Sequence, residues 1–240
     1  MPRDTLSADR IVAAAIDLLD AEGLDGLNMR SLGGRLGSAP TAVYWHVESK
    51  DNLVRLAADA VWGEIELPDL SETDWRAAAT AMATGLHEML NRHPWLGQAF
   101  GSYLLYGAGK ARYDDHNLAI YEKAGFAGMD ADQATATVFI YVLGCALAPA
   151  AELSLRRRLS QEGANAEQAL ADTMAKGIEI AKQFPRLRQR LNDASAQHYA
   201  EAPADTFEFG LTAILDGLQA RLVLRAAVAH HLDEFTPCRG

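Results

Sequence analysis

The chain has 240 residues, of which 49% are hydrophobic and 22% charged, and its formal net charge is −10. This is an ordinary globular composition with room for a sizeable core, and two cysteines exclude a disulfide framework. The acidic balance argues against non-specific nucleic-acid binding by the chain as a whole.

The start of the chain, its two cysteines and its most apolar stretch favour a cytoplasmic protein that does not enter a membrane. The first ten residues lack an apolar run behind a basic start, so we expect no signal peptide. The most apolar stretch, about 138–151, is shorter than the ~20 residues that span a bilayer.

The first sixty-five residues predict four helices in close succession. The first carries a stripe of apolar residues over 11–19, with Ser7 as N-cap and Gly23 as its stop. Three more follow: "MRSLGGRLG" at 29–37, "PTAVYWHV" opened by Pro40, and 50–65 capped by Ser49.

The pair Gly33-Gly34 lies inside the second of these helices. Each glycine there costs ~1 kcal/mol relative to alanine. We therefore expect close packing against a neighbour to compensate at this pair.

The rest of the chain is helical in pattern, with one internal boundary at 66–73, where Pro68 interrupts the periodicity. Ser71 is expected to cap a long helix that ends near His93. Beyond it we expect a short piece at 94–102, helices at 110–125, 130–158 (kinked at Pro149) and 204–232, and a mixed pattern at 160–183.

No strand pattern is convincing, so the predicted fold is all-α. We divide it into three parts: an N-terminal three-helix helix-turn-helix domain at 1–48, a connecting helix at 49–66, and a larger helical ligand-binding and dimerisation domain at 67–240.

The third helix is the candidate for reading DNA. Val43 and Val47, spaced i, i+4, are expected to anchor it, which leaves its other positions facing outward. Residues 26–50 also hold three basic residues against one acidic, a local excess of +2. The alternative for the rings Tyr44-Trp45-His46 is partial burial against the first or fourth helix.

The stretch "GLDGLNMRSLGGRLGSAPTAVYWHVESKDNLVRLAAD" resembles the N-terminal domain of the TetR family of bacterial transcriptional regulators, and its Tyr-Trp-His-Val run is closest to the tetracycline repressor branch. Weaker similarity continues in "RHPWL", "LAIYEKAGF" and "FEFGLTAILDGLQARL". The first two resemble ligand-domain segments of the family, and the third resembles its C-terminal dimerisation helix.

The resemblance implies a set of DNA-binding positions. Tyr, Trp, His, Arg and Lys side chains can donate to phosphates, and Thr41 can contact a base edge. Ala42 departs from a polar pattern and can offer only apolar contact. The expected DNA-binding residues are Arg30, Thr41, Ala42, Tyr44, Trp45, His46 and Lys50.

The resemblance also implies a helical ligand pocket within 70–200 and a homodimer joined by the 130–158 and 204–232 helices of both chains. A ring-rich lining suits a small, largely apolar molecule, with ordinary core as the alternative for each residue. The expected lining residues are Trp62, Leu86, Met89, Leu90, Phe100, Tyr103, Tyr106, Tyr113, His116, Phe139 and Leu143.

The stretch "QAFGSYLLYGAG" contains no histidine at the place where tetracycline-binding members of the family hold magnesium. No HxxxH, CxxC or paired-carboxylate pattern is present, so we expect no metal, cofactor or catalytic residue. "GAGKAR" at 107–112 faintly resembles a phosphate loop but lacks its full spacing.

We therefore predict a ligand-responsive repressor that binds an inverted-repeat operator in double-stranded DNA as a homodimer, and not an enzyme. Two other classes remain open: a protein that sequesters a small molecule and has a vestigial DNA head, and an all-α enzyme that uses the aromatic pocket.

Overall fold

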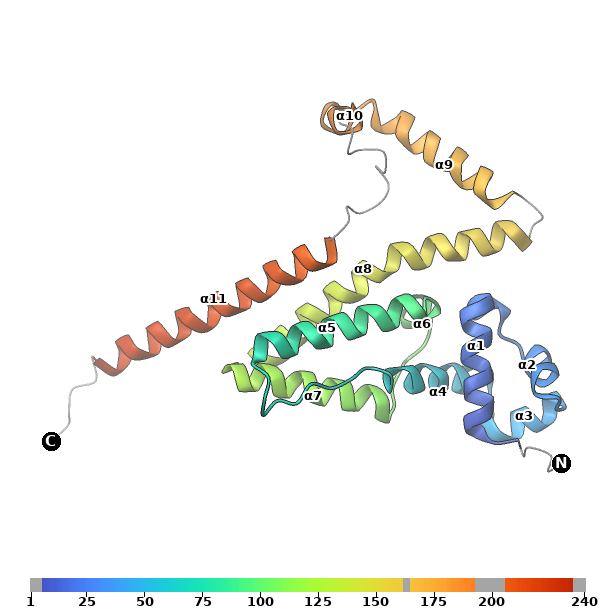
Figure 1. Cartoon of the computed structure of the whole chain (residues 1–240), viewed down its shortest axis with the longest axis horizontal. Coiled ribbons are helices and arrows are strands. Elements are labelled where there is room, and N and C mark those ends of the chain that lie inside the picture. Colours follow the sequence, from blue (N-terminus) through green and yellow to red (C-terminus); the bar gives the residue numbers. More distant parts are fainter. Residues whose placement is uncertain (1–5, 162–164, 193–205, 235–240) are drawn as a thin grey trace. The chain divides into compact units, whose positions relative to one another are not determined.

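The computed structural model describes residues 6–161, 165–192 and 206–234, and every regular element in those ranges is a helix (Figure 1). This confirms the all-α prediction. The helices are α1 (Ala8–Gly26), α2 (Met29–Leu36), α3 (Pro40–Val47), α4 (Lys50–Trp62), α5 (Trp75–Arg92), α6 (Trp95–Ser102), α7 (Ala108–Ala124), α8 (Met129–Gln161), α9 (Ala166–Ala181), α10 (Pro185–Asn192) and α11 (Thr206–Glu234).

Contacts divide the chain into two compact units. One comprises Met1–Ala150 with Gly210–Gly240, and the other comprises Ala151–Phe209. The first unit holds the N-terminal helices together with α4–α7, so the predicted boundaries at 48 and 66 do not coincide with a gap in packing and stay a prediction.

Helices α1–α3 form a small head around one apolar core. Ile11, Leu18 and Leu32 are fully buried together with Val43 and Val47, the two predicted anchors of α3. The expected starts of three helices are confirmed: the Ser7 side chain accepts from the Arg10 N–H before α1, Pro40 opens α3, and Ser49 accepts from the Asn52 N–H before α4. Gly23 also interrupts the helical path of α1, with a φ of 75°.

The two interior glycines of α2 lie in different surroundings. A Cβ at Gly33 would stand 2.7 Å from the carbonyl oxygen of Ser38, in the turn that leads to α3. At Gly34 a Cβ would meet nothing within 4 Å. The expected close packing is therefore confirmed at Gly33 and is wrong at Gly34.

Helix α4 carries the chain from the head into the body of the first unit, where it packs against both α1 and α7 (Figure 1). Its apolar positions Leu53, Ala57 and Val61 are fully buried. Helix α5 packs against α7. Helix α4 thus contributes to the core of the head and to the core of the body.

Three details differ from the sequence prediction. The N-cap of α5 is Asp74, whose carboxylate accepts from the N–H groups of Arg76 and Ala77 at 2.9 and 3.0 Å. Ser71 instead bonds to Asp69 within the preceding loop. The mixed segment at 160–183 contains α9, and α10 was not predicted although Pro185 stands at its first position.

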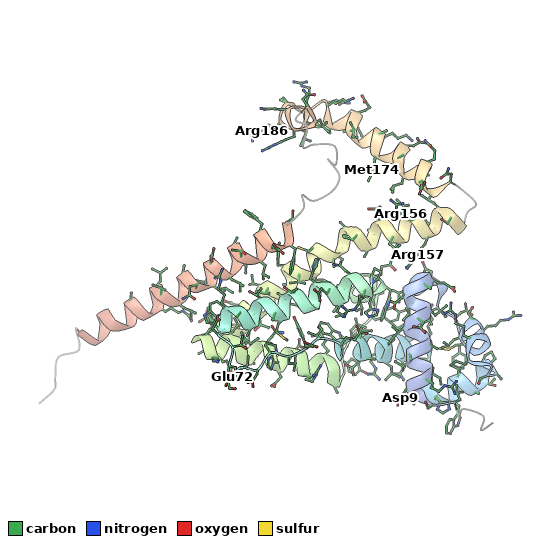
Figure 2. The ribbon with its side chains drawn as sticks, in the orientation of Figure 1. Asp9, Glu72, Arg156, Arg157, Met174 and Arg186 are labelled. Atoms are coloured by element: carbon green, nitrogen blue, oxygen red, sulfur yellow. The ribbon has the colours of Figure 1, made fainter. Side chains whose placement is uncertain are left out.

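The second unit, taken by itself, comprises the end of α8, then α9 and α10, and the first residues of α11. Figure 2 marks Arg156 and Arg157 on α8, Met174 on α9 and Arg186 on α10. Arg156 pairs with Glu152 one turn earlier at 2.8 Å.

Helix α8 is longer than expected. Its residues Met129–Ser160 are long and apolar enough to cross a membrane by length and composition, and 22% of the most apolar window is buried. The expectation that no apolar helix reaches spanning length is therefore wrong. Ile140 and Leu147 are among the exposed apolar side chains of this helix.

The two glycines of α2 make a matched test of the head. We expect Gly34→Ala to raise the free energy of unfolding by up to ~1 kcal/mol, because alanine is the better helix former. Gly33→Ala should lower it by ~1–3 kcal/mol, because the added methyl collides with backbone. Urea unfolding of both variants measures the difference, and equal effects would contradict the packing described at Gly33.

Candidate DNA-binding surface and effector site

Helix α3 presents one face to solvent and buries the other. Val43 and Val47 are fully buried, whereas Trp45 is 82% exposed, Tyr44 is 46% exposed and Thr41 is exposed. The Trp45 and His46 rings meet edge to face, with centroids 5.0 Å apart. The rings therefore do not fill a core, and this face is free to enter a groove.

The turn before α3 is fixed by backbone hydrogen bonds. Gly37 adopts a left-handed φ of 61°, and the Ser38 N–H donates to the Gly33 carbonyl at 2.9 Å. A glycine at 37 meets this conformation without the strain of a side chain. The angle between α2 and α3 is therefore set by the turn.

The other predicted DNA-binding residues lie around this face. Ala42 and His46 are half-buried on α3, and Arg30 is exposed in the first turn of α2. Lys50 donates from Nζ to the Leu24 carbonyl at 3.0 Å, where it closes the end of α1. An ammonium has three N–H donors, so this bond leaves two for a phosphate. The roles of these residues on DNA stay predictions.

Four of the predicted pocket residues meet in one cluster of rings, each from a different helix. Trp62 of α4 is 1% exposed, and its ring lies 4.8 Å from Tyr113, 6.3 Å from Phe139 and 6.4 Å from Phe100, centroid to centroid. The Lys110 ammonium stands over the rings of Trp62 and Phe139, at 5.4 and 5.5 Å from their centroids. This is a cation–π arrangement.

A cavity with a volume of about 330 Å³ lies beside this cluster, between α7 and α8. Tyr113 and Phe139 line it together with Lys110, Leu118 and Val138. Its size is at the lower end of the range for small-molecule sites. Lys110, Leu118 and Val138 were not predicted, because helical spacing alone does not separate a cavity wall from a core position.

Two polar groups near the cluster are enclosed without a hydrogen-bond partner among the described residues, namely Trp62 Nε1 and His116 Nε2. A buried donor left unpaired costs ~1–3 kcal/mol. Burial raises the pKa of Tyr113 and of Tyr121 above the ordinary value, so both phenols stay neutral. The cavity therefore combines apolar walls with the neutral Tyr113 phenol, the Lys110 ammonium and the carboxylates of Asp114, Asp115 and Asp132.

Of the predicted lining residues, Tyr113 and Phe139 line the cavity and the others do not. Leu86, Met89 and Leu90 are buried core residues of α5, and Tyr103 and Leu143 are half-buried. Tyr106 is 60% exposed, with its ring under the Arg55 guanidinium at 4.8 Å, and does not join the ring cluster.

Comparison with known proteins identifies the family. Residues 67–222 match the family described as "Tetracyclin repressor-like, C-terminal domain", and residues 11–57 match "Bacterial regulatory proteins, tetR family". The chain belongs to the TetR family.

Relatives of this TetR-family chain include named repressors. It is 31% identical over 225 residues to the HTH-type transcriptional repressor DrrR1 of Streptomyces coeruleorubidus, covering 93% of this chain and 81% of that protein. It is 30% identical to the Tetracycline repressor protein class A from transposon 1721 of Escherichia coli, covering 92% and 94%. A 39% identical HTH-type transcriptional regulator of Saccharopolyspora erythraea matches over 58% of this chain, and the chain spans 59% of that relative's length.

Among solved structures, the TetR family protein ActR of Streptomyces coelicolor in complex with actinorhodin is similar, with a TM-score of 0.70 and 27% identity over 90% of this chain and 97% of that chain. ActR was also solved with (S)-DNPA, and that structure matches with a TM-score of 0.66 at 26% identity over 91% of this chain and 99% of that chain.

In this TetR-family chain, α4 and the residues just after it are held at three points to α7 and to the segment that leads into α7. The Arg55 guanidinium donates to the Tyr106 carbonyl at 3.3 Å, and Asp59 Oδ1 accepts from the Lys110 N–H at 3.0 Å. At the far end, Arg112 donates to the carbonyls of Gly63 and Ile65, at 3.3 and 3.2 Å. We call these three contacts the α4–α7 clasp.

The segment "GAGKAR" belongs to this clasp. A Cβ at Gly107 would collide with the Asp59 carboxylate, and a Cβ at Gly109 would collide with the Asp59 carbonyl oxygen. The two glycines let the start of α7 approach α4, and the carboxylate sits at a helix N-terminus, where negative charge is favoured. The resemblance to a phosphate loop thus has a physical basis, with a carboxylate of the same chain as the anion.

The clasp predicts a steric difference between two glycines. Gly109→Ala should lower the free energy of unfolding by ~1–3 kcal/mol, because its methyl forces α7 away from α4. Gly101→Ala in α6 is the matched control, since its Cβ would meet nothing within 4 Å. Thermal unfolding compares them, and equal stabilities would refute the close approach.

Removal of the Asp59 carboxylate also tests the contact between α4 and the start of α7. Asp59→Ala should cost ~1 kcal/mol, in the range of a lost helix N-cap. Asp59→Asn keeps an oxygen acceptor and should cost less. Urea unfolding of the pair separates the hydrogen bond from the charge, and no loss in either variant would contradict the role of Asp59.

Proposed function

We propose that this chain is a cytoplasmic repressor that binds an inverted-repeat operator as a homodimer and is released by a small, largely apolar molecule. The observation that carries the proposal is the course of α4. It begins next to the exposed face of α3 and ends at Trp62 in the ring cluster. A change at the cluster can thereby reach the head.

The proposed DNA contact rests on the exposed face of α3. Two such helices in a dimer would sit in successive major grooves ~34–36 Å apart. Phosphate contacts by Lys50 and Tyr44 would fix the register, and Thr41 would contact a base edge. Because Ala42 offers only a methyl group, part of the sequence preference would come from DNA shape.

The proposed homodimer rests on apolar side chains left in solvent on α8 and α11. Ile140 of α8 is 66% exposed, and Val223 and Leu224 of α11 are exposed as well. Exposed apolar side chains that recur on two helices favour a partner surface. The predicted four-helix bundle would bury them, and it accounts for the membrane-like composition of α8 without a membrane.

The proposed effector site is the cavity beside the ring cluster. Flat apolar molecules stack on aromatic walls, here the rings of Tyr113 and Phe139, and an acidic or acceptor group could pair with the Lys110 ammonium. The similarity to ActR, whose structures hold actinorhodin or (S)-DNPA, supports a small-molecule effector. Effector binding can shift the head only by its difference in affinity for the two states.

A single experiment tests the function as a whole. Selection from random duplex DNA should yield an inverted repeat bound by the purified protein. Small molecules are then screened for release of the protein from that sequence. Failure to enrich any sequence would favour a sequestering protein with a vestigial head, whereas turnover of a bound molecule would favour the enzyme alternative.

The head predicts a salt-dependent contact. We expect the double variant Lys50→Ala/Tyr44→Ala to bind the selected operator about 10- to 100-fold more weakly, with the slope of log K against log salt reduced by about 1 for each lost phosphate contact. Fluorescence anisotropy at several salt concentrations measures both. Lys123→Ala removes the same charge from α7 and should leave the slope unchanged.

The ring cluster predicts that Trp62 couples effector binding in the cavity to release of the head from DNA. Trp62→Phe shrinks the ring that packs on Tyr113 and Phe139 of the cavity wall, so we expect operator affinity to hold and the effector concentration for half-release to rise about 5-fold or more. Trp75→Phe, on α5, is the matched control. Unchanged DNA affinity and unchanged release in both Trp62→Phe and Trp62→Ala would exclude this role.

A further inference from the structure

His93 lies between two carboxylates from separate parts of the chain. Its Nδ1 is 2.8 Å from Asp20 Oδ1 on α1, and its Nε2 is 3.1 Å from Glu64 Oε1 in the segment after α4. The His93 side chain is 7% exposed. The Trp95 N–H also donates to Asp20 Oδ1, at 2.8 Å.

The geometry requires a particular charge state of the ring. A carboxylate can only accept hydrogen bonds, and a neutral imidazole carries a single N–H donor. Neutral His93 can therefore bond to Asp20 or to Glu64, but not to both. The imidazolium has two N–H donors and satisfies both carboxylates at once.

These contacts join the head to the body of the first unit. Asp20 belongs to α1, which forms the core of the head, while Glu64, His93 and Trp95 belong to the body. Glu64 is held in turn by Arg92 of α5, at 2.9 Å. The chain of bonds thus runs from α1 through His93 to the point where α4 ends.

The charged neighbours favour the protonated ring. Burial by itself lowers the pKa of His93, but the hydrogen bonds and charges of Asp20 and Glu64 outweigh it and raise the pKa above its ordinary value of 6.5. Arg92 stands behind Glu64, and Trp95, the neighbour from α6, is uncharged.

We propose that His93 is a positioning residue, whose imidazolium fastens α1 to the Glu64 segment and so fixes the DNA-reading head on the body of the protein. The consequence for DNA rests on the proposed function. A head held in one orientation loses less freedom when it binds DNA, so protonation favours the operator complex.

The sign of the pH effect follows from the raised pKa. A group whose pKa is higher in the folded protein contributes its full stabilisation below the unfolded pKa. That contribution is lost as the pH rises through the folded pKa. The head should accordingly be held more firmly at pH 6 than at pH 8.

Hydrogen exchange of the whole protein without DNA tests the attachment of the head. Protection factors for α1–α3, corrected for intrinsic exchange rates, should fall about 5-fold between pH 6 and pH 8, the size expected from one hydrogen bond. His93→Gln should show low protection at both values. Glu64→Gln, at a more exposed partner, is the milder second variant and should also flatten the profile.

His87→Gln is the matched control, because His87 lies on α5 and its bond to Asn91 is within the same helix. It should retain the wild-type profile. If His93→Gln and Glu64→Gln both keep the wild-type fall between pH 6 and pH 8, the proposal is overturned. A uniform loss of protection with the pH dependence intact would overturn it too, since His93 would then act only as packing.

Operator binding forms a separate arm. The gain in affinity from pH 8 to pH 6 should be about 5-fold larger in the wild type than in His93→Gln. The residues of α3 are the same in both proteins, so their contribution to the comparison cancels. Equal gains would contradict the effect on DNA. Failure of every variant to bind DNA would instead count against the proposed function and leave the exchange result standing.

Discussion

The close approach of α4 and α7 is the constraint on which the other features depend. The Asp59 carboxylate can reach the first turn of α7 only because Gly107 and Gly109 lack side chains. This approach places Lys110 over Trp62 and Phe139, and it seats Arg112 on the carbonyls at the end of α4. The effector cavity and the helix that leads to the head are therefore parts of one packed arrangement.

The fold was largely predictable because its signals are local. Ser7 and Ser49 predict helix starts because serine is a good N-cap, and Pro40 does so because proline suits the first helical position. The i, i+4 spacing of Val43 and Val47 predicts the buried face of α3. The prediction of Ser71 as the N-cap of α5 was wrong because Asp74, three residues later, is also a good cap and is nearer the apolar run. Choice between two competent caps depends on tertiary packing.

The site was predictable only in part, because its chemistry depends on contacts between distant residues. Rings at 62, 100, 113 and 139 could be named from composition, but Tyr106 looks equally suitable and lies outside the cluster. Asp20 and His93 are 73 residues apart in the sequence, and Asp59 and Lys110 are 51 apart. No local pattern predicts a hydrogen bond across such separations. Contacts of this kind are recognised only once the helices are placed.

The exposure of Trp45 gives the molecule an optical signal of its own. The chain has four tryptophans, and Trp62 and Trp95 are buried while Trp75 is half-buried. Indole emission shifts to longer wavelength in water, so the red edge of the spectrum comes mainly from the head. Binding of DNA to α3 can thus be followed in the unlabelled protein by measuring tryptophan fluorescence at the long-wavelength edge of the emission spectrum.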